Sequence, residues 1–240
     1  MGVRQVDFYL QCHSRGTPVN DAKNEIKKIW RIIGTGESCV LELRALWPSA
    51  IPKSQPPIIK HFRTNDYKSL QEYKVAFENE ALRLNGRGYN MYTVMNPIKK
   101  TFLGRAVTDA DISHRELVLI DIDRTSGEKV PANDSELEAA NQLADEVSAY
   151  LEHLEWPDPI RVMSGNGHHL YYVLPEFSNS DESREFTQTL LLNLSDKFDN
   201  EIVKIDTSVF NASRITKVVG TVARKGLESE GRPYRMARML

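Results

Sequence analysis

The chain has 240 residues, of which 40% are hydrophobic and 27% charged, and its formal net charge is -2 at pH 7. This composition predicts a globular protein with one sizeable core or two joined modules. No apolar run approaches the roughly 18 residues of a membrane span and no signal-peptide pattern opens the chain, so we expect a soluble, cytoplasmic protein with no membrane partner.

Cysteine usage and the placement of charge bear on the compartment and on partners. Cys12 and Cys39 are too few for a disulfide framework and lack the paired spacing of a zinc site, so we expect a reducing compartment and no zinc. Residues 202–240 contain eight Lys or Arg against three acids, which gives this segment a local charge of +5. Such a basic end favours a phosphate-bearing partner, and a solvated surface is the alternative.

In the first half of the chain, apolar spacing predicts two helices and two strands. The first helix is expected over residues 20–33, capped by Asn20 and ended by Gly34, because isoleucines and a tryptophan recur at helical spacing. Cys39 to Leu43 then forms an apolar run typical of a buried strand. The remaining elements expected here are an irregular connection with four prolines over 47–57, a helix over 68–84 and a strand near 90–95.

The second half continues the alternation of strands and helices. Leu117 to Asp123 is a near-continuous apolar run that predicts a strand. Ser135-Glu-Leu-Glu138 forms a capping box that opens a helix, whose core side is expected to hold Leu137, Ala140, Leu143, Val147, Tyr150 and Leu154. Further along we expect a hairpin over 163–174, a helix near 183–198, and strands near 202–207 and 214–219. The alternation predicts a mixed α/β fold.

The strand over 117–123 ends in two acids. Residues two apart in a strand point the same way, so Asp121 and Asp123 project side by side while Ile122 faces the core. Adjacent carboxylates repel each other unless a cation lies between them, and hard oxygen ligands suit Mg²⁺ or Mn²⁺. The alternative is a strand that ends in two solvated acids.

Ser164-Gly-Asn-Gly167, in the hairpin, is followed by two histidines. Asn-Gly between apolar runs predicts a tight turn, because both turn positions need positive φ. The same loop could hold an anion through glycine N–H groups and the Ser164 hydroxyl. Strand alternation places His168 and His169 on opposite faces, so at most one faces a site, and a structural or surface role is the alternative for either.

A third candidate segment follows the strand near 202–207. Asp206 ends that strand, and four basic residues come after it: Arg214, Lys217, Arg224 and Lys225. A third carboxylate beside the first pair would complete a cation site, and the basic residues could neutralise a triphosphate or a template backbone. Surface charge is the alternative for each basic residue taken singly.

Taken in order, the three motifs resemble those of the archaeo-eukaryotic primase superfamily. They are hydrophobic-Asp-x-Asp over 120–123, Ser-Gly-x-Gly-x-His over 164–169, and hydrophobic-Asp over 205–206 with a basic tail. The sequence looks closest to the primase-polymerase domains of phage and plasmid replication proteins. This resemblance covers residues 39–240 and implies an α+β fold, in which an RNA-recognition-motif-like catalytic module packs against an amino-terminal α/β module. We expect a single primase-polymerase domain over 1–240, with modules over 1–110 and 111–240.

The resemblance also implies the roles of individual residues. Asp121, Asp123 and Asp206 would be the catalytic ligands of two divalent ions, Mg²⁺ or Mn²⁺. The family pattern selects His169 over His168, since His168 occupies the variable position of the motif. The residues implied to bind the nucleoside triphosphate are Ser164, Gly165, Asn166, Gly167, His169, Arg214, Lys217, Arg224 and Lys225.

The activity implied is that of a template-directed nucleotidyltransferase, a DNA primase or DNA polymerase, in a prokaryotic, phage or plasmid setting. Its partners would be a primed single-stranded DNA template and nucleoside triphosphates, with a helicase or a carboxy-terminal helical priming domain outside this chain. Two other classes of protein stay open. One is a non-catalytic replication initiator with an RNA-recognition-motif-like sheet, and the other is a metal-dependent glycosyltransferase that uses Asp-x-Asp.

Overall fold

The computed structural model describes residues 19–34 and 39–240, so Cys12 lies outside the described residues. In chain order the elements are α2 (Val19–Ile26), η1 (Lys27–Arg31), β1 (Val40–Leu46), β2 (Ile58–Arg63), η2 (Thr64–Asp66), α3 (Leu70–Gly86), β3 (Asn90–Val94), η3 (Asp109–Asp111), β4 (His114–Arg124), α4 (Asp134–His153), β5 (Ile160–Met163), β6 (His168–Ser178), α5 (Asp181–Phe198), β7 (Val203–Ile205), β8 (Ile215–Lys217), β9 (Val222–Ala223), β10 (Arg235–Met236) and β11 (Arg238–Met239). None of the helices in these two ranges has the length and apolar character needed to span a membrane.

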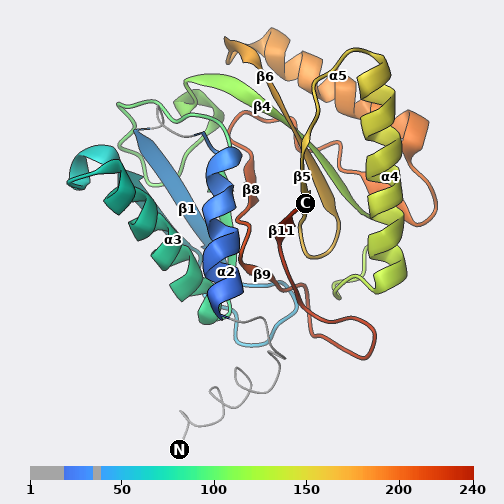
Figure 1. Ribbon diagram of the computed structural model, residues 1–240, viewed down its shortest axis with the longest axis horizontal. Helices are drawn as coiled ribbons and strands as arrows, with labels where there is room; N and C mark the ends of the chain where they lie inside the picture. Colours follow the sequence, from blue (N-terminus) through green and yellow to red (C-terminus); the bar gives the residue numbers. More distant parts are fainter. Residues whose placement is uncertain (1–18, 35–38) are drawn as a thin grey trace, which may run out of the picture.

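The strands form two main sheets that lie side by side. The smaller sheet has the order β2-β1-β3-β8, the larger has the order β11-β5-β6-β4-β7, and β10 and β9 form a short third ladder. The named strand pairs are antiparallel. In Figure 1, α2 and α3 flank the smaller sheet, α4 and α5 flank the larger one, and β8 runs between them. The elements are therefore the mixed set expected from the sequence, with antiparallel pairing.

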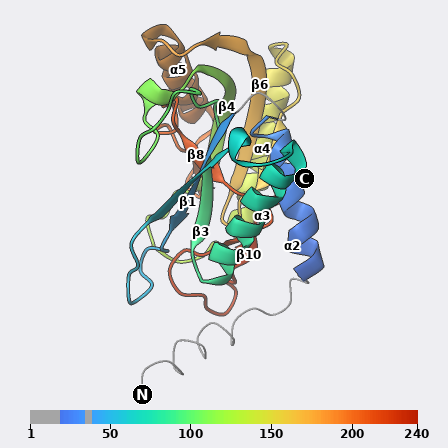
Figure 2. The same cartoon turned by 90° about the vertical axis from the view of Figure 1, so that its left-hand side faces the viewer.

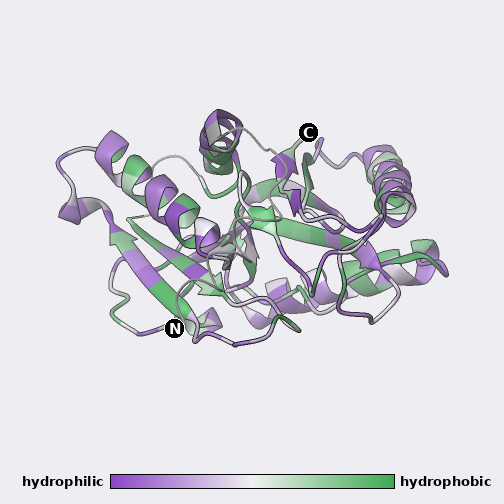
Figure 3. Ribbon diagram, turned by 90° about the horizontal axis from the view of Figure 1, so that it is seen from below, coloured by the Kyte–Doolittle hydropathy of each residue, from purple (hydrophilic) through white to green (hydrophobic). Residues whose placement is uncertain are grey.

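A continuous apolar core joins the two sheets to their helices. It includes Leu43 of β1, Phe77 of α3, Leu119 of β4, Val147 of α4 and Leu194 of α5. Figure 2 shows α3 running along β1 and β3. In Figure 3, hydrophobic stretches follow the central strands while the helices carry hydrophilic turns as well. Burial of one helix stripe and one sheet face is the arrangement expected of layered domains.

The first predicted helix is present, with two differences. It begins at Val19, so Asn20 lies in its first turn and is not its cap, and its last turns tighten into the 3₁₀ helix η1. The strand expected over 39–43 is β1, and the prolines of 47–57 do form an irregular connection. The strand β2, which pairs antiparallel with β1, was not expected from the sequence.

The capping box of α4 is formed by other residues than predicted. The cap is Asn133, whose Oδ1 accepts from the Glu136 N–H at 2.8 Å, while the Glu136 carboxylate accepts from the Asn133 N–H at 2.9 Å. The predicted box of Ser135 with Glu138 is wrong, because Asn133 already has the extended backbone that ends the preceding loop. The predicted core side holds for Ala140, Leu143 and Val147, which are buried, and is wrong for Leu154, which is 50% exposed just after the helix ends.

The chain crosses from one sheet to the other between β7 and β8. β7 pairs with β4 in the larger sheet, and β8 pairs with β3 in the smaller one. The modules expected over 1–110 and 111–240 stay a prediction, since β8 belongs to the second range by sequence and to the first sheet by hydrogen bonding. This crossover brings the basic residues of 214–225 to the side of the smaller sheet that faces β4.

Candidate active site

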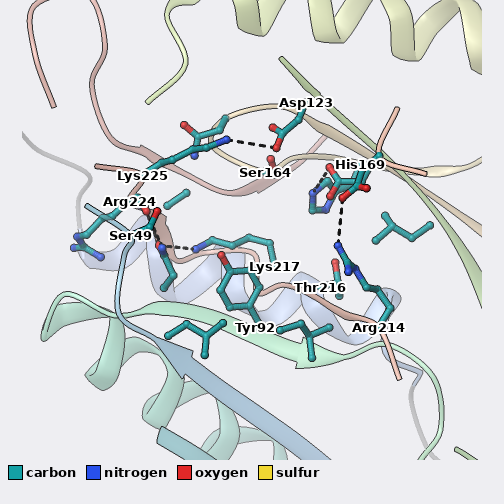
Figure 4. A pocket seen from close by; sticks show the side chains of 18 of the residues that line it. Ser49, Tyr92, Asp123, Ser164, His169, Arg214, Thr216, Lys217, Arg224 and Lys225 are labelled. Atoms are coloured by element: carbon teal, nitrogen blue, oxygen red, sulfur yellow. Dashed lines mark hydrogen bonds and ion pairs between the residues drawn. The ribbon is translucent and has the colours of Figure 1, made fainter. Parts of the chain in front are cut away.

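A cavity of about 460 Å³ lies between the two sheets. In Figure 4, Asp123, Ser164 and His169 face Tyr92 and Lys217 across it. The polar residues that line it are Ser49, Asn90, Tyr92, Asp121, Asp123, Ser164, Asn166, His169, Asp206, Arg214, Thr216, Lys217, Arg224 and Lys225. Of the site residues predicted from the sequence, the structure brings all but Gly165 and Gly167 to the wall of this cavity.

The acidic wall is built by two neighbouring strands. Ile122 is fully buried between Asp121 and Asp123, as strand alternation predicts, and both carboxylates reach the cavity. Asp206 follows β7, which pairs with β4 through Ile205 and Ile122, and the Asp206 N–H donates to the Asp121 carbonyl at 2.8 Å. Main-chain pairing therefore brings the three acids to one end of the sheet.

Each of these carboxylates faces a basic side chain. Asp121 Oδ1 lies 3.3 Å from His169 Nε2, Asp123 Oδ2 lies 3.7 Å from Lys225 Nζ, and Asp206 Oδ2 lies 3.5 Å from an Arg214 nitrogen. Among residues 19–34 and 39–240, no group of three His, Cys, Asp or Glu side chains is arranged to hold a metal ion as it stands. The carboxylates turn toward these bases, so their oxygens do not converge on one point.

The two acids of β4 differ in their electrostatics. Burial acts to raise the pKa of Asp121, but His169, Arg214 and Lys225 outweigh it and hold that pKa below its ordinary value. Burial raises the pKa of Asp123, and the negative charge of Asp121 adds to the effect against the opposing charge of Lys225. Asp123 is thus a carboxylate whose ionised form lacks full compensation, which is the condition that favours a bound cation.

The two histidines of the hairpin have separate environments, as alternation predicts. His169 Nδ1 lies 2.8 Å from the Tyr171 hydroxyl, which in turn contacts the Thr216 hydroxyl of β8. This buried chain links the two sheets and fixes the imidazole with Nε2 toward Asp121. His168 packs in the core on the other face, where burial and the charge of Arg161 lower its pKa to about 4.

The turn from Ser164 to Gly167 differs from the predicted geometry. Positive φ falls on Gly165, at 106°, and neither Asn166 nor Gly167 has it, so the Asn-Gly assignment is wrong. Tertiary packing explains the change. A Cβ on Gly165 would lie 2.5 Å from the Ala223 Cβ, and one on Gly167 would lie 2.1 Å from the Ile122 carbonyl oxygen. Both glycines let the turn press against neighbouring strands.

Several polar groups of this turn are already hydrogen-bonded. The Ser164 hydroxyl accepts from the Gly167 N–H at 3.2 Å and lies 3.1 Å from the Gly167 carbonyl, and Asn166 Oδ1 accepts from the Ala132 N–H at 3.0 Å. The hydroxyl and the amide thus shape the turn and tie it to the loop before α4. That these groups also hold an anion stays a prediction.

The basic wall comes from β8 and the segment after β9. Lys217 is only 4% exposed, and its ammonium lies 5.3 Å from the centre of the Tyr92 ring. Burial, with the charge of Arg224, lowers the pKa of Lys217 to about 7. Arg224 is half-buried, and one of its terminal nitrogens has no hydrogen-bond partner in the described part of the chain. The hydrogen-bond partners of Lys217 are uncharged, so its positive charge stays available to an incoming anion.

Side chains from two other segments fix the crossover that carries Arg214. Asp109 Oδ1 accepts from the Ser213 N–H at 2.8 Å and from the Ser213 hydroxyl at 2.6 Å. Asn96 Nδ2 donates to the Ala212 carbonyl at 3.0 Å. The sequence predicts no role for these anchors, nor for the cavity residues Asn90 and Tyr92. Their alternation on β3 indicates a shared face, but nothing in the sequence says that this face looks toward β4.

Known proteins resemble this chain in structure. No family model and no curated protein matches its sequence. Two solved structures are similar at a TM-score of 0.51. One is primase RepB′, at 12% identity over 91% of this chain and 56% of that chain. The other is the polymerase domain of Mycobacterium tuberculosis Ligase D in complex with DNA, at 14% identity over 91% of this chain and 81% of that chain. The chain spans little more than half of the RepB′ chain. It has the fold of these primase and polymerase domains, which confirms the resemblance at the level of the fold.

Proposed function

We propose that this chain is a template-directed nucleotidyltransferase of the primase-polymerase class, which adds nucleotides to a primer on single-stranded DNA. The observation that carries the proposal is the cavity, where Asp121, Asp123 and Asp206 face a set of basic side chains across a gap between two sheets. The similar structures are a primase and a polymerase, the latter in complex with DNA. Acids for cations and bases for phosphates are the two parts that nucleotidyl transfer requires.

Two divalent ions, Mg²⁺ or Mn²⁺, suit the acidic wall. Asp121, Asp123 and Asp206 offer carboxylate oxygens, which hard cations prefer. Burial, with the charge of Asp121, raises the pKa of Asp123, and a cation would stabilise the ionised form of this carboxylate. When bound, such ions lower the pKa of a 3′-hydroxyl and stabilise the pyrophosphate leaving group. Ligation would turn the carboxylates away from His169, Lys225 and Arg214, so these bases would become free to meet phosphate oxygens.

The basic wall would position the triphosphate. When the Tyr171 hydroxyl donates to His169 Nδ1, the proton of the imidazole lies on Nε2, which faces the cavity as a donor. Arg214, Lys217, Arg224 and Lys225 would offset the charge of the phosphates, and Ser164 would add a hydroxyl. The protein would thus contribute positioning and charge stabilisation and needs no nucleophile of its own.

Two observations weigh against the other classes of protein. A sheet that stacks bases needs exposed aromatic residues, and Tyr171 and Tyr172 are fully buried. A glycosyltransferase with Asp-x-Asp leaves Asp206, the hairpin turn and the basic residues without a role, whereas all of these segments reach the same cavity.

The decisive experiment is primer extension on primed single-stranded DNA, with labelled nucleoside triphosphates and Mn²⁺ or Mg²⁺. Asp121→Ala/Asp123→Ala should abolish extension. The matched control is Asp181→Ala/Asp196→Ala, which removes two exposed acids of α5 and should extend like the parent. Extension by the cavity variant at the parent's rate would refute the assignment. A parent chain that binds primed DNA and never extends it would favour the non-catalytic initiator.

A further inference from the structure

The side chain of Asn90 lies at the centre of the basic wall. It is buried at the start of β3, and its amide contacts two segments that are far away in the sequence. Its Nδ2 donates to the Arg224 carbonyl at 2.7 Å, and its Oδ1 accepts from the Arg224 N–H at 2.8 Å. The same Oδ1 accepts from Lys217 Nζ at 3.4 Å. One carboxamide therefore holds the backbone of one cation and the head group of another.

The pair between Asn90 and Arg224 is one that few side chains can make. A carboxamide has one donor group and one acceptor on the same carbon, so it can bind both the N–H and the carbonyl of a single residue. A carboxylate lacks the donor, and an apolar side chain lacks both. The amide replaces the strand neighbour that Arg224 does not have, and its loss would leave buried backbone groups unpaired.

Asn85 makes a parallel pair two residues earlier in the same segment. Its Nδ2 donates to the Val222 carbonyl and its Oδ1 accepts from the Val222 N–H, both at 2.9 Å. Asn85 is also buried. Val222 and Arg224 are alternate residues, so the two amides hold one edge of the segment. Only the Asn90 amide also contacts Lys217, and this difference supplies a matched control.

Lys217 depends on neutral partners. Its ammonium contacts Asn90 Oδ1, the Val222 carbonyl and the Tyr92 ring, and it forms no ion pair with a carboxylate among the described residues. A neutral amide keeps the lysine in place and leaves its positive charge uncancelled. That charge then stays available to a ligand in the cavity.

We propose that Asn90 is a positioning residue for the triphosphate, because its amide holds Arg224 and Lys217 at the basic end of the cavity. This inference rests on the proposed function and adds to it a residue that acts through two others. A structural clamp alone would support the fold without affecting the recognition of phosphates. A positioning role therefore predicts that an Asn90 variant binds the triphosphate more weakly, whereas a purely structural role predicts a loss of stability alone.

The test compares Asn90→Ala with Asn85→Ala in single-nucleotide extension. Asn90→Ala should raise the KM for the nucleoside triphosphate about tenfold, which corresponds to the loss of about 1.4 kcal/mol of binding, with kcat changed by less than about threefold. Direct binding measurements should also show that Asn90→Ala reduces the ratio of the affinity for the nucleoside triphosphate to the affinity for the monophosphate. Asn85→Ala should lower the melting temperature about as much as Asn90→Ala does, and it should leave KM within about twofold of the parent.

Equal KM effects of the two variants, or no effect of Asn90→Ala, would overturn the positioning role. If Asn90→Ala does not fold, Asn90→Asp keeps the acceptor, removes the donor and adds a negative charge beside Lys217, and it should raise KM in the same direction. Amide hydrogen exchange of residues 222–225 separates this inference from the proposed function. Exchange there should be faster in Asn90→Ala than in the parent, and unchanged exchange refutes the clamp whether or not the parent extends primers.

Discussion

The acidic and basic walls of the cavity are held in place by different interactions. Asp121 and Asp123 belong to one strand and Asp206 follows its neighbour, so main-chain hydrogen bonds fix the acids. Lys217 and Arg224 lie at the ends of short strands, where buried amides from distant parts of the chain hold them. Strand pairing tolerates most side-chain changes, whereas a buried side-chain network depends on each member. Substitutions outside the cavity should therefore change the positions of the basic side chains more than the positions of the acids.

The largest expected effect tests the acidic wall with a single change. Asp206→Ala should reduce the rate of single-nucleotide extension by about a thousandfold, because it removes a carboxylate from the charge-stabilising set. Lys225→Ala on the basic wall should cost only about tenfold, since other cations remain beside the phosphates. Both side chains are part-exposed, so both variants should fold. Similar losses in the two variants would mean that the walls do not differ in this way.

The neighbouring histidines provide the next comparison. His169→Ala should lower extension about a hundredfold, because the imidazole reaches the cavity and its orientation is fixed by the Tyr171 hydroxyl. His168→Ala should stay within a few fold of the parent per folded molecule, since His168 lies in the core on the opposite face. Extension rates are scaled to the folded fraction measured by circular dichroism. A His168→Ala variant as inactive as His169→Ala would contradict the division of roles.

Local pattern was sufficient to predict how the two acids of β4 are arranged. Alternation along β4 places Asp121 and Asp123 on one side of Ile122, and that arrangement depends only on the two-residue period of a strand. The separation of His168 from His169 follows from the same period. These features need no knowledge of which strands are neighbours.

Features set by distant contacts could not be predicted. Gly165 takes the positive φ because the turn meets Ala223, which is 58 positions away in the chain. Asn85 was expected in a loop before β3, yet it lies at the end of α3 with its amide on Val222. The strand β2 follows a proline-rich segment and pairs with β1, where the prolines suggested only an irregular connection. Each depends on a partner that the local sequence does not specify.

A pH experiment sharpens the comparison on the basic wall. The pKa of Lys217 is about 7 in the free chain, and a triphosphate would favour the protonated ammonium. The affinity for a nucleoside triphosphate should therefore fall as pH rises from roughly 7 to 9, by at most about tenfold per unit, because binding must take up a proton. Calorimetric titration measures the slope. Lys217→Gln should bind more weakly and lose that slope, and an unchanged slope in this variant would assign it to another group.

The smallest effect concerns stability and the buried histidine. His168 has an ordinary pKa of 6.5, and burial, with Arg161 and His169, lowers it to about 4 in the folded chain. Between these values the unfolded chain binds a proton that the folded chain does not, so the free energy of unfolding falls as pH falls from 6.5 to about 4. The contribution of one group to the slope is at most about 1.4 kcal/mol per pH unit. Urea unfolding of the parent and of His168→Leu across this window should differ by a slope of that sign. Parallel curves would mean that folding does not lower the pKa of His168, which would contradict its burial in the core.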